Sequence, residues 1–161
     1  MKAINLWKLV LAVCAVFAFS ACNDNDGDDK DISGVAGTYN GYTSAAFSPA
    51  GSPIVKVTED ETVKVTVNDD KKTATVVLTS SLWGELKIEN AVVVKSKQGY
   101  ALTGTGKAEM AMPGSPAPAE EYDYTMTGTV LSAEEVSVAY SITGLMNGTV
   151  ITFITGTPPQ Q

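Results

Sequence analysis

The side chains that could carry out chemistry in this 161-residue chain are few, and two of the most versatile types are missing. The chain has no histidine and no arginine. Without histidine it cannot form a Ser-His-Asp triad or a zinc site built on imidazole. Without arginine it cannot clamp a phosphate or carboxylate with two parallel hydrogen bonds. Carboxylates, lysines, tyrosines and the thiols of Cys14 and Cys22 remain. We therefore expect a protein that is not an enzyme and has no catalytic residue.

Two of the carboxylates, those of Glu59 and Glu61, interrupt a segment whose valines share one parity. The valines are Val55, Val57, Val63, Val65 and Val67. A continuous strand would turn both acids to the valine face. We favour one long strand with a β-bulge that lets the acids reach solvent. Two alternatives stay open: a turn over residues 59–61 would make nine strands, and an inward pair of carboxylates could serve a hydrolase.

Motifs for metals and cofactors are also missing. The chain contains no glycine-rich loop that could cradle a phosphate. The acidic run NDNDGDD at residues 23–29 resembles a calcium loop, but the glutamate that closes such a loop is absent. We therefore predict no metal site and no cofactor.

The first 21 residues have the three parts of a secretory signal peptide. Lys2 and Lys8 supply positive charge, and the apolar run at residues 9–19 has eleven residues. A membrane span needs about 20. The motif FSAC at residues 19–22 resembles the lipobox that lipoprotein signal peptidase cuts, although leucine is more usual at its first position. The resemblance implies that Cys22 is lipidated and anchors the protein to a membrane. The alternative is an ordinary secretory signal with an unrelated cysteine.

Residues 22–33 form an acidic tether, with aspartates at positions 24, 26, 28, 29 and 31. A polar, like-charged stretch buries nothing and stays extended. It is either a plain spacer or a segment that resembles the surface-export signal of Bacteroidota lipoproteins. We expect an exported outer-membrane lipoprotein that is either surface-exposed or faces the periplasm. Without the signal peptide, nine lysines oppose eighteen acids, a net charge of 9 − 18 = −9, which disfavours nucleic acid as a partner.

Residues 34–157 have the pattern of antiparallel β-strands, and residues 158–161 form a short tail. Runs rich in valine, threonine and tyrosine are bounded by glycine, proline, asparagine and aspartate. They predict strands near residues 36–46, 54–67, 73–79, 85–95, 100–112, 120–131, 136–142 and 149–157. Along each strand apolar and polar residues alternate, as where Tyr100 and Leu102 oppose Thr103. This alternation predicts an all-β, antiparallel up-and-down barrel of about eight strands.

Several of these segments resemble a known family. The sequences GTYNG at residues 37–41, NAVVVK at 90–95, YALTGTG at 100–106 and ITFITGT at 151–157 are similar to the calycin-like, or lipocalin-like, β-barrel domain of Bacteroidota lipoproteins. Tyr39 stands where true lipocalins usually have tryptophan, and the lipocalin arginine that packs on it has no counterpart. The resemblance implies a calycin-like barrel in the cell envelope. It brings no catalytic residue to this chain.

In such a barrel, successive connections alternate between the two ends. The odd-numbered connections contain all the large apolar loop residues, which are Phe47, Leu82, Trp83, Leu145 and Met146. The tether enters at the opposite, charged end, so we expect these side chains to point away from the membrane. They either form a binding rim at the barrel mouth or fold inward and plug the barrel.

The inward faces carry further side chains that suit a ligand. A tyrosine hydroxyl needs a partner once it is buried, and methionine adapts to irregular shapes. We predict a site for a small apolar ligand that comprises Phe47, Leu82, Trp83, Tyr100, Tyr122, Tyr124, Tyr140 and Met146, with Met110, Met112 and Met126 on the same inner faces. The alternatives are a surface interaction module that contacts a glycan or protein through the mouth loops, and a purely structural envelope lipoprotein. The sequence carries no signal for the oligomeric state.

Overall fold

The computed structural model describes residues 31–48, 51–111 and 118–159. The described residues all belong to one compact unit, which begins at Asp31. The predicted signal peptide, Cys22 and the tether up to Lys30 lie outside the described residues, as does Met112. In the described segments, no helix has the length and apolar character needed to cross a membrane.

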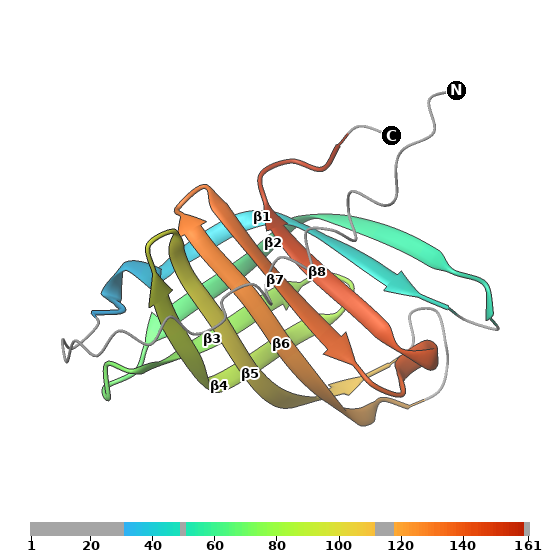
Figure 1. The fold of residues 1–161 in the computed structure, drawn as a ribbon. Helices are drawn as coiled ribbons and strands as arrows, with labels where there is room; N and C mark the ends of the chain where they lie inside the picture. The colour runs from blue at the N-terminus through green and yellow to red at the C-terminus, as the bar shows by residue number, and fades with distance from the viewer. Residues whose placement is uncertain (1–30, 49–50, 112–117, 160–161) are drawn as a thin grey trace. The chain divides into compact units, whose positions relative to one another are not determined.

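Eight antiparallel strands follow one another along the chain and close into a barrel (Figure 1). They are β1 (Gly37–Phe47), β2 (Ile54–Val67), β3 (Thr73–Ser80), β4 (Gly84–Ser96), β5 (Gly99–Met110), β6 (Glu120–Ser132), β7 (Glu135–Ile142) and β8 (Thr149–Thr155). Each strand pairs with the next, and β1 pairs with β8 through residues 41–46 and 150–155. The predicted all-β, up-and-down barrel of eight strands is confirmed.

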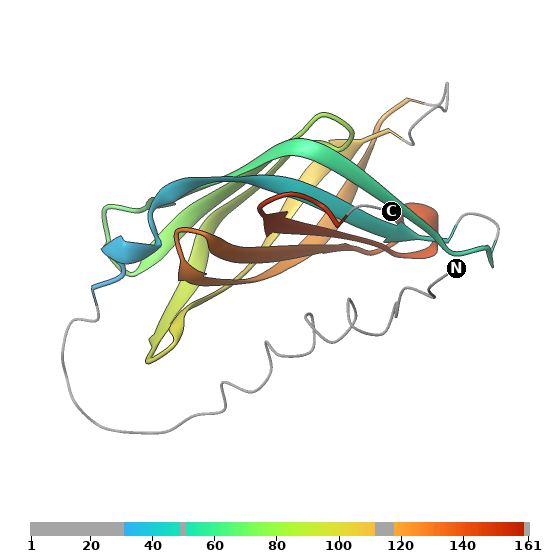
Figure 2. The ribbon, with the colours of Figure 1, turned by 90° about the horizontal axis from the view of Figure 1, so that it is seen from above.

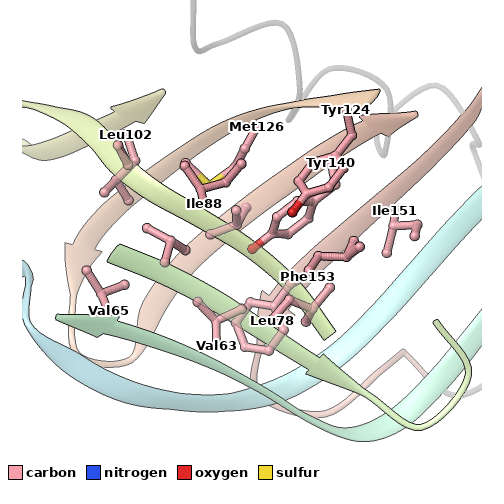
Figure 3. Packing of buried hydrophobic residues seen from close by; sticks show 14 of the residues in the cluster. Val63, Val65, Leu78, Ile88, Leu102, Tyr124, Met126, Tyr140, Ile151 and Phe153 are labelled. Atoms are coloured by element: carbon pink, nitrogen blue, oxygen red, sulfur yellow. The ribbon is translucent and has the colours of Figure 1, made fainter. Parts of the chain in front are cut away.

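Alternate residues of every strand face a common core. On β6, Tyr124, Met126 and Val130 are buried, whereas Asp123 and Thr125 between them are exposed. Inward side chains from different strands converge in the interior (Figure 3). The period of two in the sequence therefore corresponds to an inner and an outer face, as a closed sheet requires.

Strand β2 is continuous and contains a bulge, as predicted, but the bulge acts differently from the expectation. Gly41 of β1 pairs with Glu61, whereas Thr43 pairs with Thr58, so β2 carries one extra residue between these pairs. Asp60, in this extra stretch, has a left-handed φ of 58°. The bulge exchanges the faces, so Val63 and Val65 point inward while Val55 and Val57 face outward. The expectation that all five valines share a face is therefore wrong.

The two acids beside the bulge also differ in their exposure to solvent. Glu59 is exposed, but the side chain of Glu61 is buried, with only 1% of its surface accessible. The prediction that the bulge releases both acids to solvent is wrong for Glu61. This residue follows the bulge along β2 and points into the barrel, as Val63 does two residues later. The inward pair of carboxylates is not formed either, since Glu59 faces solvent.

Two short 3-10 turns that the sequence pattern did not reveal cover the two ends of the barrel. Turn η2 (Ser33–Val35) precedes β1, and its Val35 is fully buried. Turn η4 (Leu145–Asn147) joins β7 to β8, and its Leu145 is buried. Figures 1 and 2 show them at opposite ends, which we call the η2 end and the η4 end. Ile32, within the predicted tether, is already buried.

Because successive connections alternate, each end has its own set. Residues 68–72, 97–98 and 133–134 connect strands at the η2 end, where β1 begins and β8 ends. Residues 48–53, 81–83, 111–119 and 143–148 connect strands at the η4 end. The η4 end therefore holds the apolar loop residues, and the single long β2 preserves the predicted assignment of ends.

Candidate functional site

The apolar loop residues at the η4 end pack into the barrel instead of standing out as a rim. Trp83 retains 6% of its accessible surface and belongs to the core. The ring of Phe47 meets that of Trp83 edge to face, with 6.0 Å between centroids. Leu82 and Met146 are partly buried against the same core. These residues were expected either to form a binding rim or to fold inward and plug the barrel, and in the structure they pack inward.

The local sequence explains how Trp83 is held. Ser80, the last residue of β3, points inward, and its hydroxyl oxygen accepts hydrogen bonds from the backbone N–H groups of Leu82 and Trp83 at 3.3 and 3.1 Å. Gly84 then adopts a φ of 75°, which glycine accepts without steric cost. This tight turn directs the indole of Trp83 back over the end of the barrel.

The predicted tyrosines do not gather in one place. Tyr100 lies near the η2 end, where the Lys95 ammonium is 5.8 Å from its ring centroid. Tyr122 lies near the η4 end and donates a hydrogen bond to Glu120 at 3.1 Å. Tyr100 is thus separated along the barrel from the other predicted site residues.

Tyr124 and Tyr140 lie deeper and contact each other. Their rings meet edge to face with centroids 6.0 Å apart. The Tyr124 hydroxyl donates to the backbone carbonyl of Lys87 at 2.7 Å, so this residue is satisfied. The Tyr140 hydroxyl has no hydrogen-bond partner among the described residues. Burial raises the pKa of Tyr140 far above its ordinary value, so the hydroxyl keeps its proton at neutral pH.

Tyr140 belongs to a set of buried polar atoms that have no partner in the described part of the chain. We call this set the inner polar group; it consists of Thr43 Oγ1, Thr58 Oγ1, Glu61 Oε2, Trp83 Nε1 and the Tyr140 hydroxyl. A buried polar group without a partner costs about 1–3 kcal/mol. Proteins satisfy most such atoms with protein, water or a ligand. The atoms of this group are therefore candidates for hydrogen bonds with water or a ligand.

The strand register places the inner polar group in the η4 half of the barrel. Thr43 and Thr58 are direct cross-strand partners on β1 and β2. Thr43 also faces Phe153 of β8, and Tyr140 of β7 is opposite Ile151 two residues away on that strand. Figure 3 shows Tyr140 and Phe153 reaching into the same interior. Four strands and the Trp83 turn thus contribute to one region.

Glu61 is the acidic member of the group. One carboxylate oxygen, Oε1, accepts hydrogen bonds from the backbone N–H and the hydroxyl of Ser81, at 3.1 and 2.9 Å. The other oxygen, Oε2, has no partner among the described residues. Within these residues the lysines that form ion pairs are Lys87, which pairs with Glu89 on its own strand, and Lys107, which pairs with exposed acids of β6. Glu61 thus presents a buried, half-satisfied carboxylate to the interior.

This arrangement differs from that of a metal centre or a carboxylate hydrolase. In the described segments, no cluster of three or more His, Cys, Asp or Glu side chains could hold a metal ion. Hydrolysis of glycosides by carboxylates uses two acids that flank the scissile bond, but Glu59 faces solvent. The inner polar group offers hydrogen-bonding capacity: one acceptor from Glu61, one donor from Trp83, and hydroxyls that can donate or accept.

Sequence reasoning identified Trp83 and Tyr140 but missed Thr43, Thr58 and the unpartnered oxygen of Glu61. A signal for Thr43 was present, since its parity matches that of Tyr39, an inward residue of the same strand. For Thr58 the signal was hidden, because its inward position depends on where the bulge falls.

Comparisons with known proteins agree with this architecture. Residues 35–157 match the family model of the calycin-like beta-barrel domain. A crystal structure from Bacteroides fragilis, named a "putative outer membrane protein", aligns with a TM-score of 0.61 and 26% identity over 78% of this chain. The chain spans only 45% of that protein.

A second crystal structure, isotype 1 transferrin binding protein B from serogroup B Neisseria meningitidis, aligns with a TM-score of 0.46 and 13% identity. That alignment covers 74% of this chain and 25% of the Neisseria protein. A search of curated proteins finds no match.

Proposed function

Since the chain belongs to the family of calycin-like beta-barrel domains, we propose that it is a membrane-anchored lipoprotein of the bacterial envelope that binds a small, largely apolar ligand. The ligand lies in the η4 half of the barrel and contacts the inner polar group. The protein binds and does not catalyse.

One observation carries the ligand proposal: five buried polar atoms without partners among the described residues lie in a largely apolar interior. Ligand sites in proteins are mainly apolar and contain a few convergent polar groups that orient the ligand. An interior meant only to be filled would use apolar side chains at these positions, because each unpaired polar atom lowers stability. The polar atoms are therefore best explained by something they bind.

The alternative of a surface interaction module has less support. Such a module would present aromatic side chains at the barrel mouth, since tyrosine and tryptophan dominate the energy of protein interfaces. Trp83 and Leu145 are buried instead. The exposed large apolar residues in the described segments are Ile54, Val55, Val92, Val94 and Leu131, which do not lie together at the mouth.

The ligand proposal is tested by native mass spectrometry of the chain as its host makes it, released from detergent. We expect a species that carries the added mass of a small molecule, and the loss of that species in the Trp83→Ala variant. The Leu131→Ala variant, changed on the outer face, should retain the ligand. A chain that shows no added mass in every preparation, and gains none from added alkyl compounds with cationic, neutral or anionic head groups, contradicts the proposal.

The location is proposed on the motif at residues 19–22 and on the likeness to a Bacteroides protein named as an outer membrane protein. Lipidation is tested by feeding cells labelled palmitate. We expect label in the wild type and in Cys14→Ala, the matched control, and none in Cys22→Ala. Two or more acyl chains hold a protein stably to a membrane, whereas one holds it reversibly. Label that persists in Cys22→Ala refutes the anchor.

A further inference from the structure

We infer that the ligand carries a cationic amine head on an apolar body, and that Glu61 is the counter-charge that selects it. This inference rests on the proposed ligand-binding function and adds the class of ligand. It separates amines from carboxylate-headed molecules such as fatty acids.

The first step is the state of the Glu61 carboxylate. Its side chain is buried, its Oε1 atom is held by Ser81, and its Oε2 atom is free of protein partners in the described segments. A buried carboxylate is costly unless a positive charge or further hydrogen bonds compensate it. The bonds from Ser81 fix the position of the carboxylate and leave one oxygen directed at whatever fills the region. A group that donates hydrogen bonds and carries positive charge satisfies that oxygen best.

The second step is the absence of a competing lysine among the described residues. Lys56 is the lysine nearest along β2 on the inner face, because it pairs with inward Ala45. Lys56 is exposed and forms no ion pair with Glu61. Lys64, on the other side, faces outward because it pairs with Thr38 and Val77. The described residues therefore supply no internal cation for Glu61.

The third step concerns the other four atoms of the inner polar group, which differ in whether they can donate or accept a hydrogen bond. Thr43, Thr58 and Tyr140 can accept or donate, so they adapt to a head group, while Trp83 Nε1 only donates. The walls around them are apolar, with Leu78, Phe153 and Ile151 fully buried. An anionic head group would meet Glu61 as a like charge in a region of low dielectric, and this repulsion disfavours it.

The fourth step is access, which requires the η4 turn to move. Met146 and Asn147 have left-handed φ angles of 48° and 62°, a conformation that is strained for methionine. Two long hydrogen bonds join this turn to Ser48: the Ser48 N–H donates to the Met146 carbonyl at 3.4 Å, and the Asn147 amide donates to the Ser48 carbonyl at 3.3 Å. Among the described segments of this end, this turn is readily displaced, because it contains a strained residue and is held by long bonds.

The test compares octylamine, octanol and octanoate, which share one apolar tail and differ only in head group. The chain as its host makes it is stripped of ligand, kept in detergent, and titrated with each probe while unfolding temperature and native mass are recorded. We expect octylamine to bind about tenfold or more tightly than octanoate, with octanol between them. In Glu61→Gln, which keeps the size of the side chain, octylamine should lose about tenfold or more in affinity while octanol changes little.

Glu59→Gln is the matched control, because it removes the same charge from the exposed side of the bulge, two residues away. It should leave octylamine binding unchanged, and it also controls for partition of the probes into detergent. Equal loss of octylamine binding in both variants would mean surface attraction and would overturn the inference.

The wild-type ranking needs no variant, so the inference remains testable even if Glu61→Gln does not fold. Octanoate binding as tightly as octylamine overturns the amine inference but leaves the proposed ligand-binding function standing. Failure of all three probes to bind, in a chain that also carries no host ligand, overturns both.

Discussion

At the scale of single residues, tyrosine rings and glycines complement one another inside the barrel. Gly106 on β5 pairs with Tyr124 on β6. A Cβ atom at Gly106 would lie 2.7 Å from the ring and hydroxyl of Tyr124 and 2.9 Å from the carbonyl oxygen of Lys87, which accepts the Tyr124 hydrogen bond. Glycine at this position therefore makes room for a ring and its hydrogen bond. Tyr140, next to Tyr124, has no such bond among the described residues.

The substitution Gly106→Ala tests this fit. The added methyl group must push the Tyr124 ring away from Lys87, and overpacking of this kind costs about 1–3 kcal/mol. We expect a loss of that size in the free energy of unfolding, measured by urea denaturation. Thr105→Ala, one residue away on the outer face, should change it by no more than about 0.5 kcal/mol. Equal effects of the two substitutions would show that Gly106 is not tightly packed.

At the scale of elements, the alternation of residue types predicted the strands well, and irregular features limited the prediction of the site. Strand β6 has inward residues at every second position from Tyr122 to Val130, so its faces were readable directly. In β2 the single extra residue near Asp60 reverses parity. The sequence suggested a bulge but not which residue of β2 is the extra one. The position of that residue decides whether the side chain of Glu61 is buried.

Two other features, the η4 turn and the position of Tyr100 along the barrel, were not predicted for similar reasons. The η4 turn depends on left-handed residues such as Met146, and methionine is not a residue whose presence predicts that conformation. Tyr100 was grouped with the other tyrosines because faces are readable from parity, but position along the barrel depends on the register between strands. The face of a strand on which a residue lies can be inferred from the local sequence. The position of that residue along the barrel cannot.

The β2–β3 turn offers a pH-dependent test at this scale. The Asp70 carboxylate accepts hydrogen bonds from the N–H groups of Lys72 and Thr73 and from the Thr73 hydroxyl, at 2.9, 2.9 and 2.8 Å. These bonds hold the pKa of Asp70 below its ordinary value of 3.8. A carboxyl whose pKa is lowered by folding stabilises the protein above its unfolded pKa, and this contribution is lost as the pH falls through the folded pKa.

We therefore expect Asp70→Ala to lower the urea midpoint at pH 7, and the difference from wild type to shrink below about pH 4. Asp69→Ala, the exposed neighbour in the same turn, is the control and should show no such pH-dependent difference. A difference for Asp70→Ala that stays constant down to pH 2 would mean that the carboxylate bonds contribute nothing specific.

At the scale of the whole molecule, the two ends of the barrel have different roles. The first strand begins and the last strand ends at the η2 end, where Tyr39 donates a hydrogen bond to the Val35 carbonyl at 2.8 Å and so ties η2 to the barrel. The η4 end holds Trp83, the η4 turn and the inner polar group nearby. In the lipoprotein that we propose, the inner polar group would lie toward the end of the barrel opposite to the one where the first strand begins.

Surface display is the prediction that belongs to this scale. Replacing Asp24, Asp26, Asp28 and Asp29 with alanine should preserve labelling by palmitate and reduce the digestion of the protein when whole cells are treated with protease. Replacing the exposed Glu59 and Asp69 in the barrel with alanine, a similar change outside the tether, should leave digestion at the wild-type level. Unchanged digestion of the tether variant would reduce the acidic run to a spacer.

The pairing of β1 with β8 has a consequence for how the chain reaches its fold. All other pairings join consecutive strands, whereas this one joins residues 41–46 to residues 150–155. Closing so long a loop carries an entropic cost that local hairpins avoid, and such contacts slow folding. A ribosome makes β1 first and β8 last, so the hydrogen-bonding edge of the first strand stays open until the final strand emerges. The barrel can therefore close only after synthesis of the whole domain. Until then the unpaired edge of β1 must be protected from pairing with other chains.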